Sequence, residues 1–411
     1  MLNRIILCCL CILFLSSCND GRKEINYKVS AQNIKLLGQL RSFEKHGDLS
    51  SQIESSERLI IGGEITLKLP NGHSIRSNKY DVVTVKLSNG NNLPLNFAEL
   101  VYLAGDFIGD PNTQIGGHNL LLGEEAFIDN FETMESAPNK DYLPEIIKLV
   151  NQQTKANIDN ISSGNALDVP EDANIKFNCI TGGGCKKFTW FLKPGLYLKL
   201  ASKNHDHFGQ DAIDSYLAGH ILALKTAAWA KRLSSPDILT QAYAYEAFAQ
   251  HFLTDLAASG HLRTPRREIA TWCSYTPSVI SLDLANIMHK KDNTQGIYVT
   301  DMSGDSWFAH GDAEIFINRN SKQLNMLVYK MQQSADQVYN VFNGRISVND
   351  AYEKSKLWMP NLDKIQHDKR NTPMLFKMEN GKLLEYNEKN KSYSTVFSCI
   401  TTLLKYKISE L

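Results

Sequence analysis

The sequence predicts a mainly α-helical fold, a helical bundle with small β elements near both ends of the chain. Three observations predict it. Long stretches in the middle of the chain place apolar residues at helical spacing, whereas shorter stretches near both ends alternate apolar and polar residues around glycine turns. In addition, 43% of the 411 residues are hydrophobic, which is enough for a sizeable core and excludes a wholly disordered chain.

The helices are predicted from the periodicity of their apolar residues. We expect them over 96–108, near 123–134 and 143–155, and over 209–232, 237–258, 278–291 and 321–342. Gly260 should stop the helix over 237–258. The segment 110–186 is otherwise rich in Asn, Gly and Ser.

Strands are predicted near both ends. Residues 58–95 alternate apolar and polar positions around Pro70-Asn71-Gly72 and Ser88-Asn89-Gly90, so we expect short strands joined in hairpins. The end of the chain contains short strand-like runs around Gly381. Residues 19–50 are polar and predict a loose lead-in.

Residues 1–17 predict a signal rather than a part of the fold. A short basic region with Arg4 precedes an apolar run that is too short to span a membrane, and the run ends in Ser16-Ser17-Cys18. This ending resembles the bacterial lipobox, in which the cysteine is lipidated and the chain is cut just before it. We therefore expect an exported protein, either a lipoprotein anchored to a membrane through Cys18 and facing the periplasm or the cell exterior, or a secreted protein. A plain secretory peptide cut elsewhere is the alternative.

The cysteines beyond the signal fit an oxidising compartment. Cys179 and Cys185 flank a glycine-rich turn and are a candidate disulfide. Cys273 and Cys399 also remain. A zinc site built from these four is disfavoured, because no two of them form a CxxC pair.

The charge of the chain is balanced. The 44 Lys and Arg residues match 44 Asp and Glu residues, which argues against a nucleic-acid partner held by phosphate neutralisation. The eleven histidines are of more interest, because neutral imidazole is the commonest metal ligand.

Several of these histidines stand close to carboxylates. His251 and Asp255 are four residues apart in a predicted helix, so both lie on one face and can reach one metal ion. His261 follows beyond the expected end of that helix. His289 and Asp292 share a face of the next helix. For His251 and Asp255, the alternative is an exposed pair that binds no metal. For His289, the alternative is a favourable contact with the helix dipole.

Further candidates lie upstream. Asp106 closes the helix over 96–108, and His207 immediately precedes the helix over 209–232. His205 competes with His207 for the same role. His220 is surrounded by Leu and Ala and is expected in the core, and His310 is expected in a loop.

Together these residues resemble the metal ligands of a known family. The order Asp106, His207, His251-x3-Asp255-x5-His261 and His289-x2-Asp292 is similar to that of the zinc-dependent bacterial phospholipases C, which share an all-helical fold with fungal single-strand nucleases. The stretch over 190–293 looks most like the larger, Gram-negative branch. The resemblance implies a bundle around a zinc cluster. It assigns Asp106, His207, His251 and Asp255 to one zinc ion and His261, His289 and Asp292 to another, with Asp106 also as a general base.

The chain departs from this family in three places. Compact members bind a third zinc through an N-terminal Trp and a nearby His, whereas here the first Trp is Trp190, and His46 and His73 both stay open as that His. Compact members end with His-x3-Glu or His-x3-Asp, whereas here that position is Asn293. We favour Asp292, because a carboxylate neutralises zinc better than an amide does. A long insertion over about 110–189 could lie over the site.

The resemblance also implies an organisation and a function. After the signal over 1–17 and a lead-in over 18–57, which follow from the N-terminal residues themselves, we expect a catalytic domain over 58–345 that includes the insertion, and an extension over 346–411. The expected enzyme is a zinc metallophospholipase C with two or three ions, which cleaves the glycerol-side phosphodiester of phosphatidylcholine-like lipids to diacylglycerol and a phosphorylated headgroup. Its partners would be the phospholipid substrate and a membrane surface, not nucleic acid. A single-strand nuclease or other phosphodiesterase, and a non-catalytic lipoprotein that binds zinc or lipid, are the alternatives.

Overall fold

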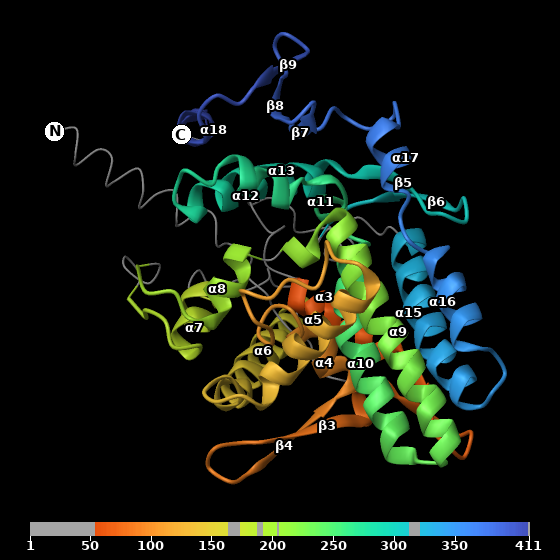
Figure 1. Ribbon diagram of the computed structural model, residues 1–411. Helices are drawn as coiled ribbons and strands as arrows, with labels where there is room; N and C mark the ends of the chain where they lie inside the picture. Colours follow the sequence, from red (N-terminus) through yellow and green to blue (C-terminus); the bar gives the residue numbers. More distant parts are fainter. Residues whose placement is uncertain (1–53, 163–172, 187–191, 204, 312–320, 410–411) are drawn as a thin grey trace.

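A computed structural model describes residues 54–162, 173–186, 192–203, 205–311 and 321–409 (Figure 1). Helices make up most of this part and its sheets are small and antiparallel, which confirms the predicted fold class. The signal, Cys18 and most of the lead-in lie outside the described residues. None of the described helices is long and apolar enough to cross a lipid bilayer.

Three long helices form the centre of the fold, and they confirm three of the predicted helices. They are α9 (Gly209–Leu233), α10 (Pro236–Asp255) and α15 (Ser321–Phe342). Gly260 does not end α10, which already stops at Asp255, and it lies instead in a separate short helix, α11 (Ser259–Arg263). α9 and α10 pack as an antiparallel pair with α15 beside them (Figure 1).

A small residue allows the helices to come close. Gly219 lies in α9, where a Cβ atom would stand 2.2 Å from a ring carbon of Phe127 and 2.7 Å from the Cβ of Ala249. Any larger side chain would therefore push α9 away from α10 and from α5 (Leu120–Glu132).

A buried polar network connects the three long helices. His220 Nδ1 lies 2.7 Å from Glu246 Oε2, and its Nε2 lies 2.8 Å from Gln337 Oε1. Ser334 donates a short hydrogen bond to the other oxygen of Glu246. His220 is fully buried in this network, as expected for a core residue. Its partners satisfy its polar atoms, so the network specifies how α9, α10 and α15 align.

The beginning of the described chain differs from the prediction. Residues Glu54–Glu64 form a helix, α3, where strands were expected from residue 58 onwards. Leu59, Ile60 and Ile61 are all buried there against α4 (Phe97–Leu103) and its neighbours. A short continuous apolar run fits a buried helix as well as a buried strand, so the pattern alone could not distinguish them.

The predicted hairpins are present further along. In the first sheet β1 (Thr66–Lys68) pairs with β2 (Ser74–Arg76), and in the second β3 (Asp81–Lys86) pairs with β4 (Asn92–Asn96). The runs around Gly381 form the sheet of β7 (Phe376–Glu379), β8 (Lys382–Asn387) and β9 (Ser392–Thr395). One further hairpin, β5 (Ile297–Thr300) with β6 (Ser306–Ala309), was not expected from the sequence.

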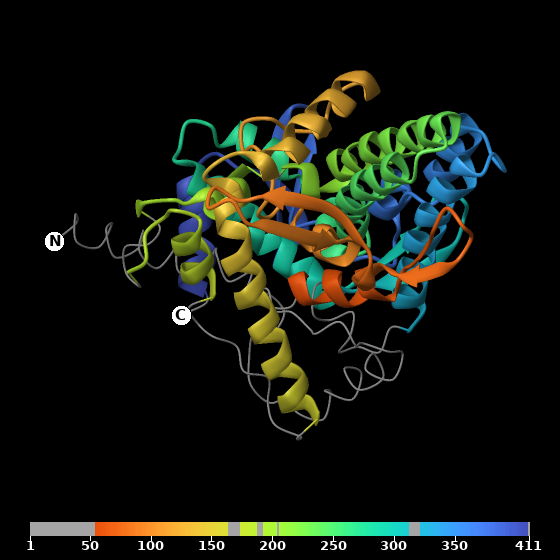
Figure 2. The ribbon, with the colours of Figure 1, turned by 90° about the horizontal axis from the view of Figure 1, so that it is seen from below.

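The long insertion is largely helical where it is described. It contains α5, α6 (Asn139–Ser162) and α7 (Ala173–Ile180), which are followed by α8 (Leu196–Lys203). α6 projects away from the central helices (Figure 2). Cys179 and Cys185, the pair suggested by the sequence, form a disulfide at the end of α7.

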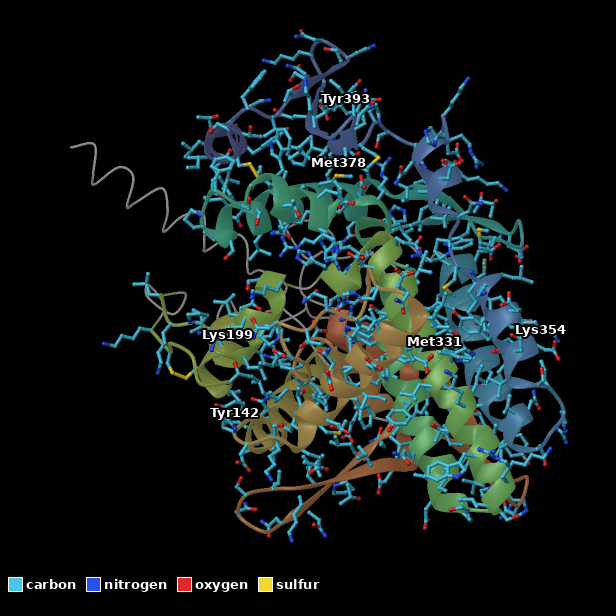
Figure 3. All side chains as sticks on the ribbon, in the orientation of Figure 1. Tyr142, Lys199, Met331, Lys354, Met378 and Tyr393 are labelled. Carbon is cyan, nitrogen blue, oxygen red and sulfur yellow. A yellow bond between two sulfur atoms is a disulfide. The ribbon has the colours of Figure 1, made fainter. Side chains whose placement is uncertain are left out.

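The C-terminal segment packs on a second apolar cluster. Two helices precede the last sheet, α16 (Val348–Lys356) and α17 (Leu362–His367), and α18 (Cys399–Ser409) follows it. The sheet and α18 cover α12 (Arg266–Trp272) and α13 (Ser278–Gln295), and Tyr393 and Met378 lie on this side of the molecule (Figure 3). A disulfide between Cys273 and Cys399, not expected from the sequence, links α12 to α18.

Candidate metal centre

Asp106 is positioned by a sharp turn at the end of α4. The helix begins at a capping box in which Asn96 and Glu99 each accept from the other's backbone N–H, and it ends at Leu103, with Ala104 as its C-cap. Gly105 then adopts a φ of 68°. A Cβ atom there would stand 2.8 Å from His207 Cε1 and 3.0 Å from His251 Nε2. Only glycine therefore lets this turn place Asp106 beside the two histidines.

His251 lies in the penultimate turn of α10 and is fully buried. Its Nδ1 lies 3.0 Å from the carbonyl oxygen of Val101, which can only accept a hydrogen bond. The Nδ1–H of His251 therefore donates to Val101, and Nε2 carries the lone pair. This carbonyl fixes both the tautomer and the ring orientation, as partners of metal-binding histidines commonly do.

His207 is positioned by the loop that begins the insertion. It closes a short 3-10 helix over His205–His207, next to the buried Asp206. The Asp206 carboxylate accepts from the backbone N–H groups of Ile115 (2.9 Å) and Gly116 (2.8 Å). Burial raises the pKa of Asp206 to about 7, against the opposite effect of these two donors. Part of the insertion thus holds the segment that carries His207.

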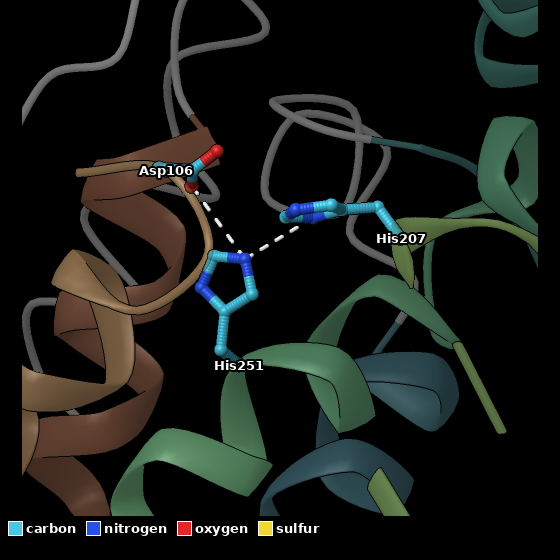
Figure 4. A group of neighbouring side chains, drawn as sticks. All are labelled: Asp106, His207 and His251. Carbon is cyan, nitrogen blue, oxygen red and sulfur yellow. Dashed lines mark hydrogen bonds and ion pairs between the residues drawn. The ribbon is translucent and has the colours of Figure 1, made fainter. Parts of the chain in front are cut away.

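Asp106, His207 and His251 form a compact buried group that could hold a metal ion (Figure 4). One ligand atom of each lies within 4.8 Å of the others. His251 Nε2 is 3.2 Å from His207 Nδ1 and 3.6 Å from Asp106 Oδ2. Neighbouring N and O ligands of a tetrahedral zinc ion are about 3.3 Å apart, given bonds of about 2.0–2.1 Å. The observed separations fit such an ion.

Asp255 contacts two of these three residues. Its Oδ2 lies 2.8 Å from His207 Nδ1 and 3.8 Å from His251 Nε2. Burial alone would raise the pKa of Asp255. The electrostatic attraction of Arg58, and to a smaller extent that of His207, outweighs burial and holds this pKa well below its usual range. The side chain is thus an ionised carboxylate inside the protein.

His261 and His289 form a second pair. Their ring centroids are 4.6 Å apart and their planes cross at 83°. His261 Nδ1 lies 2.7 Å from the carbonyl oxygen of His207, so its Nδ1–H donates and its lone pair is on Nε2. The ring of Phe208 stacks on His261 with centroids 4.7 Å apart. The backbone of His207 therefore links the two groups of histidines.

The structure separates Asp292 from this second pair and brings Asn293 to it. Both oxygens of Asp292 accept from Arg263, at 2.7 Å each. Asn293 Nδ2 lies 3.2 Å from His289 Nε2, and Asn293 Oδ1 accepts from the N–H of Gly260 at 2.6 Å. The i+4 position thus faces His289, whereas the i+3 position, which we favoured from the sequence, faces Arg263.

The remaining candidates are not brought to the centre. His73 is exposed in the turn between β1 and β2. His46 and Trp190, which bear on the third zinc, lie outside the described residues. The charged residue of this centre that sequence reasoning missed is Arg58, which forms ion pairs with both Asp106 and Asp255. No local motif marks it, because it stands in an apolar run that predicted a strand.

Comparison of the chain with protein-family models, with curated proteins and with solved structures finds no match. The chemistry of the centre therefore has to follow from its own side chains.

Proposed function

We propose that this protein is a zinc-dependent phosphodiesterase of the phospholipase C type. The observation that carries the proposal is the buried group of Asp106, His207 and His251, in which a backbone carbonyl directs the lone pair of His251 at the other two side chains. The resemblance in ligand order supports the same chemistry.

The donor set fits a zinc ion. Imidazole nitrogens and carboxylate oxygens are the ligands that catalytic zinc sites use. Asp255 Oδ2 is buried and, although it is 2.8 Å from His207 Nδ1, it accepts no well-aligned hydrogen bond within the described part of the chain. A buried carboxylate oxygen without such a bond would be costly unless a cation satisfied it. We assign Asp106, His207, His251 and Asp255 to this ion.

The second ion would be held by His261, His289 and Asn293, with Asn293 in place of a carboxylate. An amide supplies a neutral oxygen, so this position would bind zinc more weakly than the first. Asn293 Oδ1 would also have to exchange its bond to Gly260 for the metal.

The protein's own residues would position and deprotonate the attacking water. Zinc, when bound, lowers the pKa of a coordinated water toward 7 and neutralises phosphate oxygens. The Asp106 carboxylate would accept the proton of the attacking water. Arg58 orients this carboxylate, because its Nη1 donates to Asp106 Oδ2 at 2.8 Å. The phosphodiester would then break on the glycerol side, and the proton would pass to the departing alkoxide of diacylglycerol.

An exposed apolar segment that follows the loop binding Asp206 favours a lipid substrate. Leu120, Leu121 and Leu122 begin α5 and are 39%, 65% and 48% exposed. They follow the loop whose backbone holds Asp206 next to His207. Three consecutive exposed leucines are unusual on a soluble surface and suit contact with a lipid aggregate. The balanced net charge weighs against single-stranded nucleic acid.

The proposal is tested by assaying purified full-length protein on phosphatidylcholine micelles at neutral pH. We expect release of phosphocholine that a zinc chelator abolishes and added zinc restores. His251→Ala should be inactive, whereas His73→Ala, which changes an exposed histidine in a turn, should be as active as wild type.

Two outcomes would contradict the proposal. Digestion of single-stranded DNA without phospholipid hydrolysis would identify a nuclease. Zinc binding without hydrolysis of either substrate would identify a non-catalytic zinc-binding protein.

A further inference from the structure

Arg58 contacts both carboxylates of the first metal position from the side of α3. Its Nη1 donates to Asp106 Oδ2 at 2.8 Å, and its Nη2 donates to Asp255 Oδ1. Arg58 is 4% exposed. The guanidinium is thus a buried cation on the same two carboxylates that are assigned to the zinc ion.

A third hydrogen bond fixes the orientation of the guanidinium. Arg58 Nε donates to Thr254 Oγ1 at 3.0 Å, while the Thr254 hydroxyl donates its own proton to the carbonyl of His251 at 2.6 Å. The oxygen of Thr254 therefore presents a lone pair to Arg58 rather than a proton. Because arginine stays protonated in proteins, the positive charge is permanent as well as fixed in place.

The two oxygens of Asp255 face different partners. Oδ1 accepts from Arg58 and lies 3.9 Å from His261 Nδ1, whereas Oδ2 faces His207 Nδ1 at 2.8 Å and His251 Nε2 at 3.8 Å. An ion bound by the two imidazoles and Oδ2 fits this division. A further cation on Oδ1 would have to displace the guanidinium or lie beside a like charge.

We propose that Arg58 is a fixed cation of the metal centre that takes the place of a further ion between Asp106 and Asp255 and limits this position to one zinc ion. The inference rests on the proposed function only in requiring that this position binds metal. Arg58 is then a positioning residue. By attracting electron density from both carboxylates, it also leaves the bound ion more electrophilic.

The test compares the zinc content and zinc affinity of the full-length wild type with those of Arg58→Met and Arg58→Lys, with zinc itself as the probe. Lysine keeps the charge, whereas methionine removes it at similar length. At saturating zinc, we expect wild type and Arg58→Lys to bind equal numbers of ions and Arg58→Met to bind one more. Competition with a chromophoric chelator should show the first ion bound about tenfold tighter in Arg58→Met, since about 1.4 kcal/mol corresponds to a factor of ten.

The outcomes separate this inference from the proposed function. Equal zinc content and affinity in wild type and Arg58→Met, with only a lower melting temperature, would make Arg58 a structural ion-pair partner and overturn the inference. Wild-type protein that binds no zinc would overturn the proposed function and this inference with it. If Arg58→Met does not fold, Arg58→Gln removes the charge while keeping a hydrogen-bond donor, and the same results are expected of it.

Discussion

The Nε2 atom of His251 lies 3.2 Å from the Nδ1 atom of His207, although the two residues are 44 positions apart in the chain. His251 Nε2 cannot donate, because the proton of that ring is on Nδ1 and is bound to Val101. Two facing imidazole nitrogens are therefore stabilised either by the proton of His207 or by a shared cation. This pair is the geometric basis for the candidate metal position.

Gly105 offers a direct test of the close approach at this position. In Gly105→Ala the new methyl group would overlap both histidines, so we expect loss of at least about tenfold in zinc affinity as the rings separate. Gly90→Ala is the matched control, because Gly90 also has a positive φ but has nothing within 4 Å of the added Cβ. Backbone strain should cost both variants about 1 kcal/mol of stability, and the overlap with the histidines should make the loss larger in Gly105→Ala. Equal zinc affinity in the two variants would show that the turn does not shape the site.

The buried network of Glu246 and His220 predicts sensitivity to acid. Burial would raise the pKa of Glu246. The charge of His220 and the hydrogen bonds that Glu246 accepts outweigh burial, so the pKa of Glu246 is lowered. A lowered pKa means that the carboxylate contributes stability above its unfolded value of about 4.5, and this contribution is lost as the pH falls below that value. Glu246→Gln should therefore be less stable at pH 7 by about 3–5 kcal/mol and lose less on acidification. Denaturant unfolding at pH 7 and pH 3 measures both effects, and parallel pH dependence in the two proteins would contradict this.

The two disulfides should differ in their effect on stability. Cys273 and Cys399 are 126 residues apart, whereas Cys179 and Cys185 are six apart. In the chain-entropy model, replacing both cysteines of the long-range pair by serine costs about 5 kcal/mol, and doing so for the short-range pair costs about 2 kcal/mol. Unfolding in urea under oxidising conditions measures the difference. Equal losses would mean that the long-range disulfide does not constrain the unfolded chain.

The exposed leucines at the start of α5 should assist binding to lipid aggregates and should not affect the chemical step. We expect Leu121→Ser to lower hydrolysis of micellar phosphatidylcholine about tenfold and to leave hydrolysis of a soluble short-chain analogue unchanged. Leu233→Ser, at the far end of α9 and similarly exposed (56% against 65%), is the control and should affect neither substrate. A loss on both substrates in Leu121→Ser would place its effect in the fold instead.

Much of the helical framework could be predicted from the sequence, because a long run of apolar residues at helical spacing buries one continuous face only when it folds as a helix. The helices over 209–232, 278–291 and 321–342 are present within a few residues of the expected bounds. The three clustered residues Asp106, His207 and His251 were also candidates, since each stands at the end of a predicted helix or on its face. Local pattern was sufficient for the helices, whereas the choice of these three residues among the other histidines and carboxylates rested on the resemblance in ligand order.

Contacts between distant segments could not be predicted. Arg58 is 48 residues from Asp106 and 197 from Asp255, and nothing near it in sequence indicates an ion pair. The choice between Asp292 and Asn293 rested on which side chain binds zinc better, whereas contacts from α11 decide how the two side chains are used: Arg263 binds Asp292, and the N–H of Gly260 binds Asn293. The pairing of Cys273 with Cys399 likewise depends on how the C-terminal segment folds back on α12.

The most direct measurement is the zinc content of purified full-length wild type, His251→Ala and the control His73→Ala, determined by elemental analysis after dialysis against metal-free buffer. We expect zinc in wild type and in His73→Ala, and at least one ion fewer per chain in His251→Ala. Equal zinc in all three proteins would contradict a metal position built on Asp106, His207 and His251, as would the absence of zinc from wild type after incubation with it.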